Sequence, residues 1–333
     1  MSTNEIDFVV PWVDGQDLDW QKEFKEHNKN DSYCDTTFKR YRDWGLLRYW
    51  FRGVEQYAPW VRKIFFVTSG HVPDWLDLNN PKLVVVKHED YIPSEYLPTF
   101  SSHPIEVNMH RIKGLSEKFV YFNDDFFLLD HLKKTDFFRG DLPVDMAGEF
   151  PNYFESPVIS SIHINNTILI NKNFNKRKFI MKNLSKWYNP KYKELAICSL
   201  LLSPWSRFVG FYCHHLPQPF LKSTFNEVWA KEYESLHETS LNKFRSRNDV
   251  NQYAFKLWQI CTGKFYPFNK RDHSELFLLT EENYESARDL IISGKKKVVC
   301  INDEGEFGED FEKIKSILIN AFESKLTKST FER

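Results

Sequence analysis

Two short acidic clusters in the sequence each follow an apolar run. Residues 120–125 read VYFNDD and residues 299–304 read VCINDE, so both runs end in Asn-Asp followed by a second acid. Carboxylates at strand ends are poor core residues, because burying an unpaired charge costs too much free energy. If the clusters meet at one sheet edge, they could bind a hard cation such as Mg2+, which prefers oxygen ligands. Asn-Asp also stabilises turns, and the repeated pattern leaves the two interpretations about equally favoured.

The first cluster ends a series of alternating strands and helices. Apolar, β-branched runs predict strands, and apolar residues at helical spacing predict helices. The predicted strands are 6–13, 63–68, 82–87 and 118–122, and the predicted helices are 43–57 and 104–115. This alternation indicates an α/β fold, with a mainly parallel Rossmann-like or GT-A-like sheet flanked by helices. Ligands of such sheets bind at the carboxyl ends of the strands, where Asp14, Ser69 and Asp125 fall.

The pattern changes after residue 136. Helical spacing recurs at 175–183, 192–202, 225–236, 249–261 and 281–293, and a strand returns at 297–301. We therefore predict an α/β core at 1–136, completed by 296–320. A mainly helical region at 137–295 is inserted before the last sheet strand and carries His215 and Arg245.

Composition excludes several classes of protein. The 333 residues carry a net charge of -1, which argues against a nucleic-acid partner. Five cysteines without CxxC spacing argue against a zinc ribbon or a disulfide framework and fit a reducing compartment. No signal peptide and no apolar run of membrane-spanning length is found. We expect a cytoplasmic protein, which could still dock on the inner face of the cell membrane.

Four blocks of the sequence resemble the Stealth family of hexose-1-phosphate transferases, which includes bacterial capsule and cell-surface polysaccharide phosphotransferases. They are IDFVVPWVDGQD at 6–17, a long block at 42–76 and 97–128, a block at 215–229 and 243–252, and VCINDE at 299–304. The resemblance implies that a saccharide hydroxyl attacks the β-phosphorus of a UDP-sugar, so that UMP leaves and a phosphodiester forms. It also implies Mg2+ or Mn2+ and a lipid-linked oligo- or polysaccharide acceptor.

The resemblance assigns the chemistry to residues from three blocks. Asp125 matches an essential acid, and Glu106 and Arg245 match further essential positions. His215 matches the catalytic histidine, although His214 is its neighbour and rival. A histidine can accept the acceptor's proton near neutral pH, and an arginine suits bidentate phosphate contact. The expected metal ligands are Asp125, Asn302 and Asp303. Glu106 lies in the first turn of a predicted helix. The alternative to a catalytic role is that its carboxylate only stabilises the helix dipole.

Further residues are expected to contact substrate. Asp14 and Gly15 could face the uridine, or form a plain turn. Arg48 and Arg52, one helical turn apart, could reach the diphosphate, or lie on a solvated face. The remaining candidates lie in four places. Ser69 and Gly70 follow a strand, Ser101 and Ser102 precede the second predicted helix, His110 and Arg111 lie within that helix, and Asp124 belongs to the acidic cluster. His110 lies four residues after Glu106 and is expected on the same helix face.

Two other functions compete with this interpretation. A metal-dependent GT-A glycosyltransferase would use the same donor and an Asp-rich motif, but would release UDP. A carbohydrate-binding protein without catalytic activity would explain the high aromatic content, 17% of the residues, but not the concentrated acid, histidine and arginine motifs. The transferred sugar, the accepting hydroxyl and the oligomeric state are not readable from the sequence.

Overall fold

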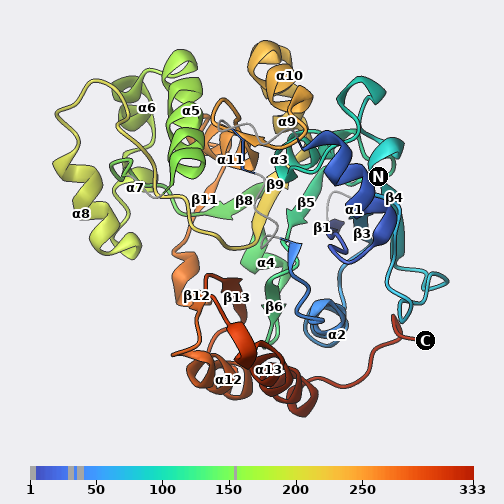
Figure 1. Cartoon of the computed structure of the whole chain (residues 1–333). Coiled ribbons are helices and arrows are strands. Elements are labelled where there is room, and N and C mark those ends of the chain that lie inside the picture. The colour runs from blue at the N-terminus through green and yellow to red at the C-terminus, as the bar shows by residue number, and fades with distance from the viewer. Residues whose placement is uncertain (1–4, 29–33, 36–40, 154–155) are drawn as a thin grey trace.

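Parallel strands form most of the central sheet of the computed structural model (Figure 1), which describes residues 5–28, 34–35, 41–153 and 156–333. In this part of the chain the sheet has five strands in the order β4-β3-β1-β5-β9, of which only β9 is antiparallel to its neighbour. The strands are β1 (Ile6–Pro11), β3 (Ile64–Thr68), β4 (Leu83–Lys87), β5 (Lys118–Tyr121) and β9 (Gln218–Leu221). The predicted α/β class with a mainly parallel sheet is confirmed.

The sheet separates two hydrophobic cores. Successive side chains of a strand point to opposite faces, so Phe8 and Val10 join one core while Val9 joins the other. Because both faces are covered, the central strands are continuous apolar runs rather than alternating ones. On the first face lies α2 (Leu47–Tyr57), and its Gly53 allows close contact, since a Cβ there would lie 2.8 Å from the carbonyl oxygen of Leu128.

A second, three-stranded sheet packs beside the first. Its order is β12-β13-β6, with β6 (Phe126–Leu128), β12 (Ser274–Leu279) and β13 (Val298–Asp303). β13 runs antiparallel to β6 and parallel to β12. The late strand predicted at 297–301 therefore exists, but it joins this second sheet instead of the central one. Strands β9 and β12 both come from the region predicted to be a mainly helical insertion, so the boundaries drawn at 136 and 296 cut across both sheets.

Helices cover the other surfaces, as Figure 1 shows. The predicted helix 225–236 is two helices, because the chain turns at Glu232. The remaining helices are α1 (Leu18–His27), α3 (Ser102–Val107), α4 (Lys134–Phe137), α5 (Pro157–Asn173), α6 (Lys176–Lys182), α7 (Leu184–Trp187), α8 (Glu194–Leu201), α9 (Lys222–Lys231), α10 (Tyr233–Leu241), α11 (Gln252–Cys261), α12 (Tyr284–Ser293) and α13 (Phe311–Lys325). The short strands are β2 (Cys34–Asp35), β7 (Phe138–Arg139), β8 (Leu142–Asp145), β10 (Arg245–Ser246) and β11 (Tyr266–Pro267).

Arg52 ties the C-terminal segment to the core. It is buried in α2, and its guanidinium donates to Glu332 at 2.6 and 2.9 Å and to Glu323 at 2.8 Å. Glu332 is itself buried, so the two charges satisfy each other in a site of low dielectric. From the sequence, Arg52 could reach a diphosphate or lie on a solvated helix face, whereas in the structure its guanidinium donates to the chain's own carboxylates. Arg48, one turn earlier, lies over the ring of Trp75 at 5.3 Å.

Replacing Arg52 should therefore lower stability and leave substrate affinity intact. We expect Arg52→Leu to reduce the free energy of unfolding by about 3 kcal/mol, because Glu332 would stay buried without a partner. Urea denaturation measures this. The Arg52→Leu/Glu332→Leu double variant should recover most of the loss. Glu323→Gln, which alters an exposed partner, should change stability by less than about 0.5 kcal/mol. A normal unfolding midpoint for Arg52→Leu, or a raised KM for the sugar donor in a stably folded variant, would contradict this assignment.

Candidate active site

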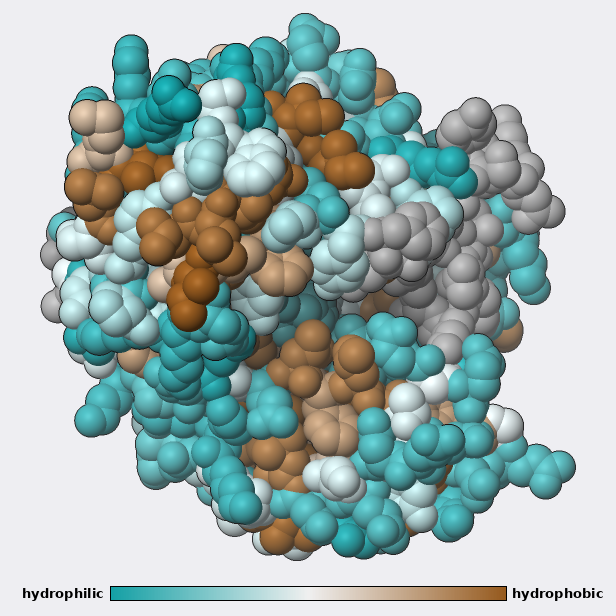
Figure 2. All heavy atoms as spheres, turned by 90° about the vertical axis from the view of Figure 1, so that its left-hand side faces the viewer, coloured by the Kyte–Doolittle hydropathy of each residue, from teal (hydrophilic) through white to brown (hydrophobic). Residues whose placement is uncertain are grey.

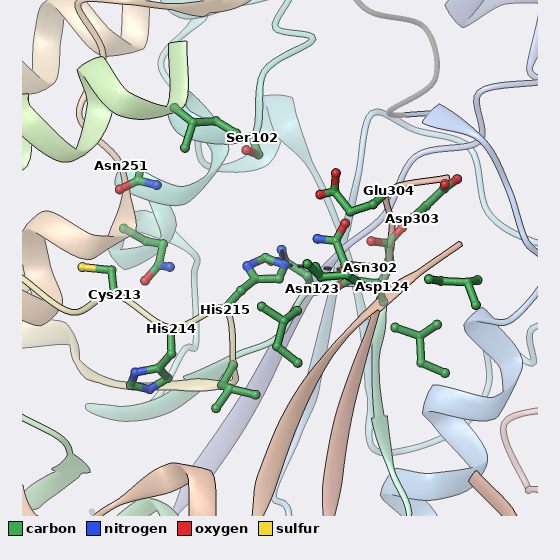
Figure 3. A pocket seen from close by; sticks show the side chains of 18 of the residues that line it. Ser102, Asn123, Asp124, Cys213, His214, His215, Asn251, Asn302, Asp303 and Glu304 are labelled. Carbon is green, nitrogen blue, oxygen red and sulfur yellow. Dashed lines mark hydrogen bonds and ion pairs between the residues drawn. The ribbon is translucent and has the colours of Figure 1, made fainter. Parts of the chain in front are cut away.

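A cavity of about 1100 Å³ lies between the carboxyl ends of β1 and β5, the second sheet and the helical region. It brings together candidates from distant parts of the chain, as Figure 3 shows for several of them. The predicted residues that line it are Ser102, Glu106, Asp124, Asp125, His215, Arg245, Asn302 and Asp303. This is the edge of the central sheet at which the sequence placed a ligand.

The two acidic clusters meet because β6 and β13 pair. Asn123, Asp124 and Asp125 follow the end of β5 and turn the chain into β6. The amide of Ile301 in β13 donates to the carbonyl oxygen of Asp125 at 2.9 Å, and the antiparallel register then carries Asn302 and Asp303 past the first cluster. The clusters thus share a cavity, as the sequence suggested, through antiparallel pairing in the second sheet.

His215 faces the first cluster. Its Nε2 lies 3.4 Å from Oδ2 of Asp125 and 3.2 Å from the side-chain amide nitrogen of Asn123, and its ring packs edge-on against Phe126. Burial lowers the pKa of His215, but the charge of Asp125 and its hydrogen bond outweigh burial and raise the pKa above its ordinary value. The ring can therefore hold a proton beside Asp125.

His214 has the opposite environment. In Figure 3 its ring points away from His215. It is buried, and Nδ1 lies 3.4 Å from the Nζ of Lys256. Burial first, and then the charge of Lys256, hold the pKa of His214 well below its ordinary value. Of the two neighbouring histidines, only His215 combines access to the acidic cluster with a raised pKa.

A buried charged network fixes the segment that carries both histidines. Asp145 in β8 lies 3.7 Å from Lys256 and 3.5 Å from Lys270, and it accepts a hydrogen bond from Gln218 at 2.6 Å. Lys270 also donates to the carbonyl oxygen of Pro217. Because the paired charges satisfy one another in the interior, they can hold residues 214–218 rigidly. This network could not be predicted from the sequence, because its members are far apart in the chain.

Arg245 and Glu106 also line the cavity. The Nη2 of Arg245 donates to Oγ of Ser102 at 3.1 Å. Both carboxylate oxygens of Glu106 are occupied, one by the hydroxyl of Tyr121 and the other by the backbone N–H of Gln252, each at 3.1 Å. Glu106 thus joins α3, β5 and α11 at the cavity wall.

Asp249 holds the arginine loop in place. This buried carboxylate pairs with His103 at 2.7 Å and accepts hydrogen bonds from the amide of Ser246 at 2.8 Å and from Asn242 at 2.7 Å. Ser101 caps α3 by accepting from the N–H of His103 at 3.2 Å. Ser101 is buried in this contact, and the neighbouring Ser102 is the one that lines the cavity.

The first cluster has oxygens suited to a cation. Within the described residues, the buried Oδ1 of Asp125 and Oδ1 of Asn123 have no hydrogen-bond partner. Asp124 projects into the cavity, where the surrounding protein and then the charge of Asp125 raise its pKa to about 7. A divalent cation beside these oxygens would satisfy the orphaned atoms and offset the repulsion between the two acids. This donor set fits a hard ion.

Cys300 lies against the same carboxylate. Its Sγ is 3.2 Å from Oδ2 of Asp125, and Asp125, His215 and Cys300 offer ligand atoms within 4.8 Å of one another. Burial, followed by the charge of Asp125, raises the pKa of the thiol well above its ordinary value. The thiol therefore stays protonated and donates to Asp125. The apolar run around Cys300 reads as core in the sequence, so its contact with the acid was missed.

Asp303 lines the cavity and contacts the 42–44 loop. Its Oδ2 accepts from the indole N–H of Trp44 at 3.0 Å and lies 3.3 Å from the guanidinium of Arg42. The expected metal ligand thus holds the 42–44 loop at the cavity. Gly15 supports the same loop, because a Cβ there would lie 2.1 Å from the carbonyl oxygen of Tyr41.

The structure places the other substrate candidates outside the cavity. Asp14 follows β1, and its backbone N–H donates to the ring of His71 at 2.8 Å. Ser69 and Gly70 are exposed at the end of β3. The helix predicted at 104–115 ends at Val107 and continues only as a 3₁₀ turn over Met109–Arg111.

This break separates His110 from Glu106. His110 packs near Phe225 and Trp229, and burial lowers its pKa to about 3. Arg111 lies over the ring of Trp229 at 4.7 Å. The one-face relation expected for Glu106 and His110 does not hold, and neither His110 nor Arg111 lines the cavity.

Comparisons with known proteins identify the family. Residues 40–144 match the family described as Stealth protein CR2, conserved region 2. The chain is 44% identical to the capsular polysaccharide phosphotransferase WcwK of Streptococcus pneumoniae, over 99% of this chain and 98% of that one. It is 42% identical to the receptor polysaccharide phosphotransferase WefC of Streptococcus oralis, over 99% of both chains.

A more distant similarity is found among solved structures. The structure of the galactosyltransferase LgtC in complex with donor and acceptor sugar analogs covers 97% of both chains, with 9% identity and a TM-score of 0.40. That score is too low for a comparison of sites. The high identity to the named phosphotransferases extends over nearly the whole chain, and from it we conclude that this chain is an enzyme of the Stealth family.

Proposed function

We propose that the enzyme transfers a sugar-1-phosphate from a UDP-sugar to a hydroxyl of a saccharide, in the synthesis of a capsular or cell-surface polysaccharide. The observation that carries the proposal is the meeting of His215, the Asn123–Asp125 cluster and Arg245 in one cavity. The names of the relatives, which include an exopolysaccharide phosphotransferase of Lactiplantibacillus plantarum at 38% identity, support the same reaction class.

In the proposed reaction an acceptor hydroxyl oxygen forms a bond to the β-phosphorus of the donor. The bond from that phosphorus to the bridging oxygen breaks, and UMP leaves with the electron pair. The hydroxyl proton passes to the imidazole ring of His215. Oδ2 of Asp125, 3.4 Å from Nε2, stabilises the resulting imidazolium. Phosphoryl transfer depends mainly on positioning and charge neutralisation, which the rigid walls of the cavity are suited to provide.

The arginine wall would bind the transferred phosphate. Arg245 offers a planar set of donors suited to phosphate oxygens, and Ser102 holds one of its nitrogens at 3.1 Å. Glu106 acts as a positioning residue, because its carboxylate is occupied by Tyr121 and Gln252. Asp249 fixes the loop on which Arg245 stands.

A divalent cation, Mg2+ or Mn2+, belongs to the same proposal. Asp125, Asp124 and Asn123 would hold it, with Asn302 of β13 beside them. When bound, it would supply positive charge to the diphosphate. Asp303, which the sequence also predicts as a ligand, belongs to the same proposal, and its Oδ2 contacts Trp44 and Arg42.

The acceptor side of the proposal concerns a lipid-linked saccharide. Across the described residues, no helix is both long and apolar enough to cross a membrane. We propose that the enzyme works at the cytoplasmic face of the cell membrane and reaches its acceptor from there.

The nucleotide released distinguishes this reaction from glycosyl transfer. With purified enzyme, a panel of UDP-sugars and a saccharide acceptor, we expect UMP in an amount equal to the phosphodiester product. Liquid chromatography quantifies UMP and UDP, and mass spectrometry identifies the product. UDP as the main nucleotide, with a product lacking phosphate, would establish a glycosyltransferase instead.

Removing the proposed base should slow turnover without loss of folding. We expect His215→Gln to lower kcat by about 100-fold or more, because the acceptor hydroxyl would lose its proton acceptor. The KM for the donor should change little. His131→Gln serves as the control, since this exposed histidine lies outside the cavity. Equal kcat values for the two variants would remove His215 from the mechanism.

The cation should be required and should depend on Asp125. Dialysis against EDTA is expected to abolish transfer, and Mg2+ or Mn2+ should restore it. Asp125→Asn should raise the metal concentration for half-maximal activity by about tenfold or more, because one ligand charge is lost. Asp130→Asn, an exposed acid five residues later, should leave that concentration unchanged. Full activity after complete metal removal would contradict the proposed cation.

A further inference from the structure

Exposed hydrophobic side chains gather on one part of the helical region. Of the seventeen large hydrophobic residues that are exposed in the described part of the chain, eight lie between residues 164 and 205. We call these eight the apolar patch, and they are Ile164, Ile168, Met181, Leu184, Ile197, Leu200, Leu201 and Trp205. Figure 2 faces the side of the molecule on which α6 and α8 lie and shows hydrophobic side chains gathered there, above a hollow. Large exposed apolar patches mark interaction surfaces.

Helix α8 shows why these side chains point outward. Leu195 is buried in the second core, and the hydroxyl of Ser199 accepts from the N–H of Glu149 at 2.9 Å. These contacts fix the inner face of the helix. Ile197, Leu200 and Leu201 occupy the opposite face at helical spacing, with 62%, 59% and 69% of their surface exposed. The outer face of α8 is therefore apolar by sequence.

The start of α6 packs against the end of α8. The buried Nζ of Lys176 donates to the carbonyl oxygen of Leu202 at 2.7 Å and to Glu149 at 2.9 Å. Arg177 and Lys178, the next two residues, are exposed, as are Met181 and Lys182 one turn later. Basic and apolar side chains of the two helices thus belong to one surface.

The charge of this segment differs sharply from that of the whole chain. Residues 171–207 contain nine lysines and arginines and one acidic residue, Glu194, whereas the chain as a whole has a net charge of -1. Glu194 is itself paired with Arg271 at 2.5 Å. Lys172, Lys176 and Lys193 pair with acids outside the segment, namely Glu232, Glu149 and Asp272. The positive charge beside the apolar side chains therefore comes mainly from the exposed Arg177, Lys178 and Lys182 of α6. A surface that joins exposed apolar side chains to such basic residues complements the interface of an anionic lipid bilayer.

The patch also adjoins the cavity. Arg271, the partner of Glu194 at the start of α8, lines the cavity wall. The cavity lining itself includes exposed apolar side chains, namely Tyr153, Leu276 and Leu278. An enzyme resting on a bilayer through this surface would hold its cavity close to a saccharide anchored in that bilayer.

We propose that the apolar patch and the basic residues of 171–207 bind the surface of an anionic phospholipid bilayer. Two copies of the chain paired through this surface would bring like charges together, which disfavours a symmetric dimer. The choice of a lipid-linked acceptor rests on the proposed function, but the binding surface follows from burial and charge alone.

Vesicle sedimentation tests the proposal without relying on transfer activity. We expect the full chain to bind vesicles in which about a third of the phosphatidylcholine is replaced by phosphatidylglycerol. Binding to phosphatidylcholine alone, or in about 0.5 M salt, should be at least tenfold weaker, because the electrostatic attraction is removed or screened. Equal binding to neutral and anionic vesicles would contradict the proposed role of the basic residues.

Two sets of variants locate the surface. The apolar variant Ile197→Ser/Leu201→Ser/Trp205→Ser and the charge variant Arg177→Glu/Lys178→Glu/Lys182→Glu should each weaken binding about tenfold or more. The matched controls, Leu18→Ser/Leu241→Ser/Ile292→Ser and Lys22→Glu/Lys25→Glu/Lys313→Glu, change exposed residues elsewhere and should bind normally. Patch variants that bind as the controls do would overturn the proposal, as would a dimer in light scattering that the apolar variant dissociates while vesicle binding is absent.

Transfer to a lipid-free saccharide acceptor separates this proposal from the proposed function. Correctly folded patch variants should retain that activity, because the cavity residues are untouched, and should lose transfer to an acceptor embedded in anionic vesicles. If the unaltered enzyme showed no transfer to either acceptor, the proposed function would be wrong. The sedimentation results would still decide whether the surface binds the bilayer.

Discussion

The pairing of β6 with β13 is the contact on which the site depends. These strands are far apart in the sequence, yet the bond from the amide of Ile301 to the carbonyl oxygen of Asp125 joins them where the first acidic cluster ends and the second begins. Without this register Asn302 and Asp303 would not reach the cavity. The carboxylates tolerate the arrangement because each has a specific neighbour. Cys300 and His215 face Asp125, and Arg42 and Trp44 face Asp303.

A second constraint acts through the histidine segment. The chain bends at His215 and Leu216, and the amide of Leu216 donates to the carbonyl oxygen of His214 at 3.1 Å. His214 lies beside Lys256, while His215 lies beside Asp125. The same side-chain chemistry then acquires opposite shifts in pKa, because one ring lies next to a positive charge and the other next to a negative one. The buried Asp145 network keeps the segment from rotating, which would exchange the two rings. Local charge therefore selects the histidine that can accept a proton.

Sequence patterns predicted the parallel strands because their evidence is local. A buried parallel strand is a continuous apolar run, and β1, β3, β4 and β5 were all found within a few residues of their ends. The helix predicted at 104–115 ends early, and the cause is also local, although its signal in the sequence is weaker. The side chain of Asn108 donates to the carbonyl oxygen of Pro104 at 2.9 Å, and such a bond competes with helix continuation. The break places His110 against Phe225 and Trp229, whereas Glu106 contacts Tyr121 and Gln252.

Features that depend on distant partners could not be read in the same way. Arg52 looks like a solvent-facing helix residue until Glu332 is placed beside it by the final turn of the chain. Cys300 looks like core, which it is, but its thiol also contacts Asp125. The family resemblance identified His215, Asp125 and Arg245 as candidates without any knowledge of such long-range contacts. It could not tell which of the acids already has a partner, because that depends on the 42–44 loop.

The separation of charges within the cavity limits where a diphosphate can lie. Asp124 and Asp125 adjoin each other, and their mutual repulsion contributes to the pKa of about 7 for Asp124. In the proposed reaction, a diphosphate approaching this cluster alone would be repelled, whereas Arg245 in the same cavity would attract it. A cation bound by Oδ1 of Asp125, which has no hydrogen-bond partner among the described residues, would offset the negative charge of the two acids. The acidic cluster and Arg245 would then both favour the proposed donor. If the donor is the proposed diphosphate, the cation would allow the acids to lie at the centre of the site.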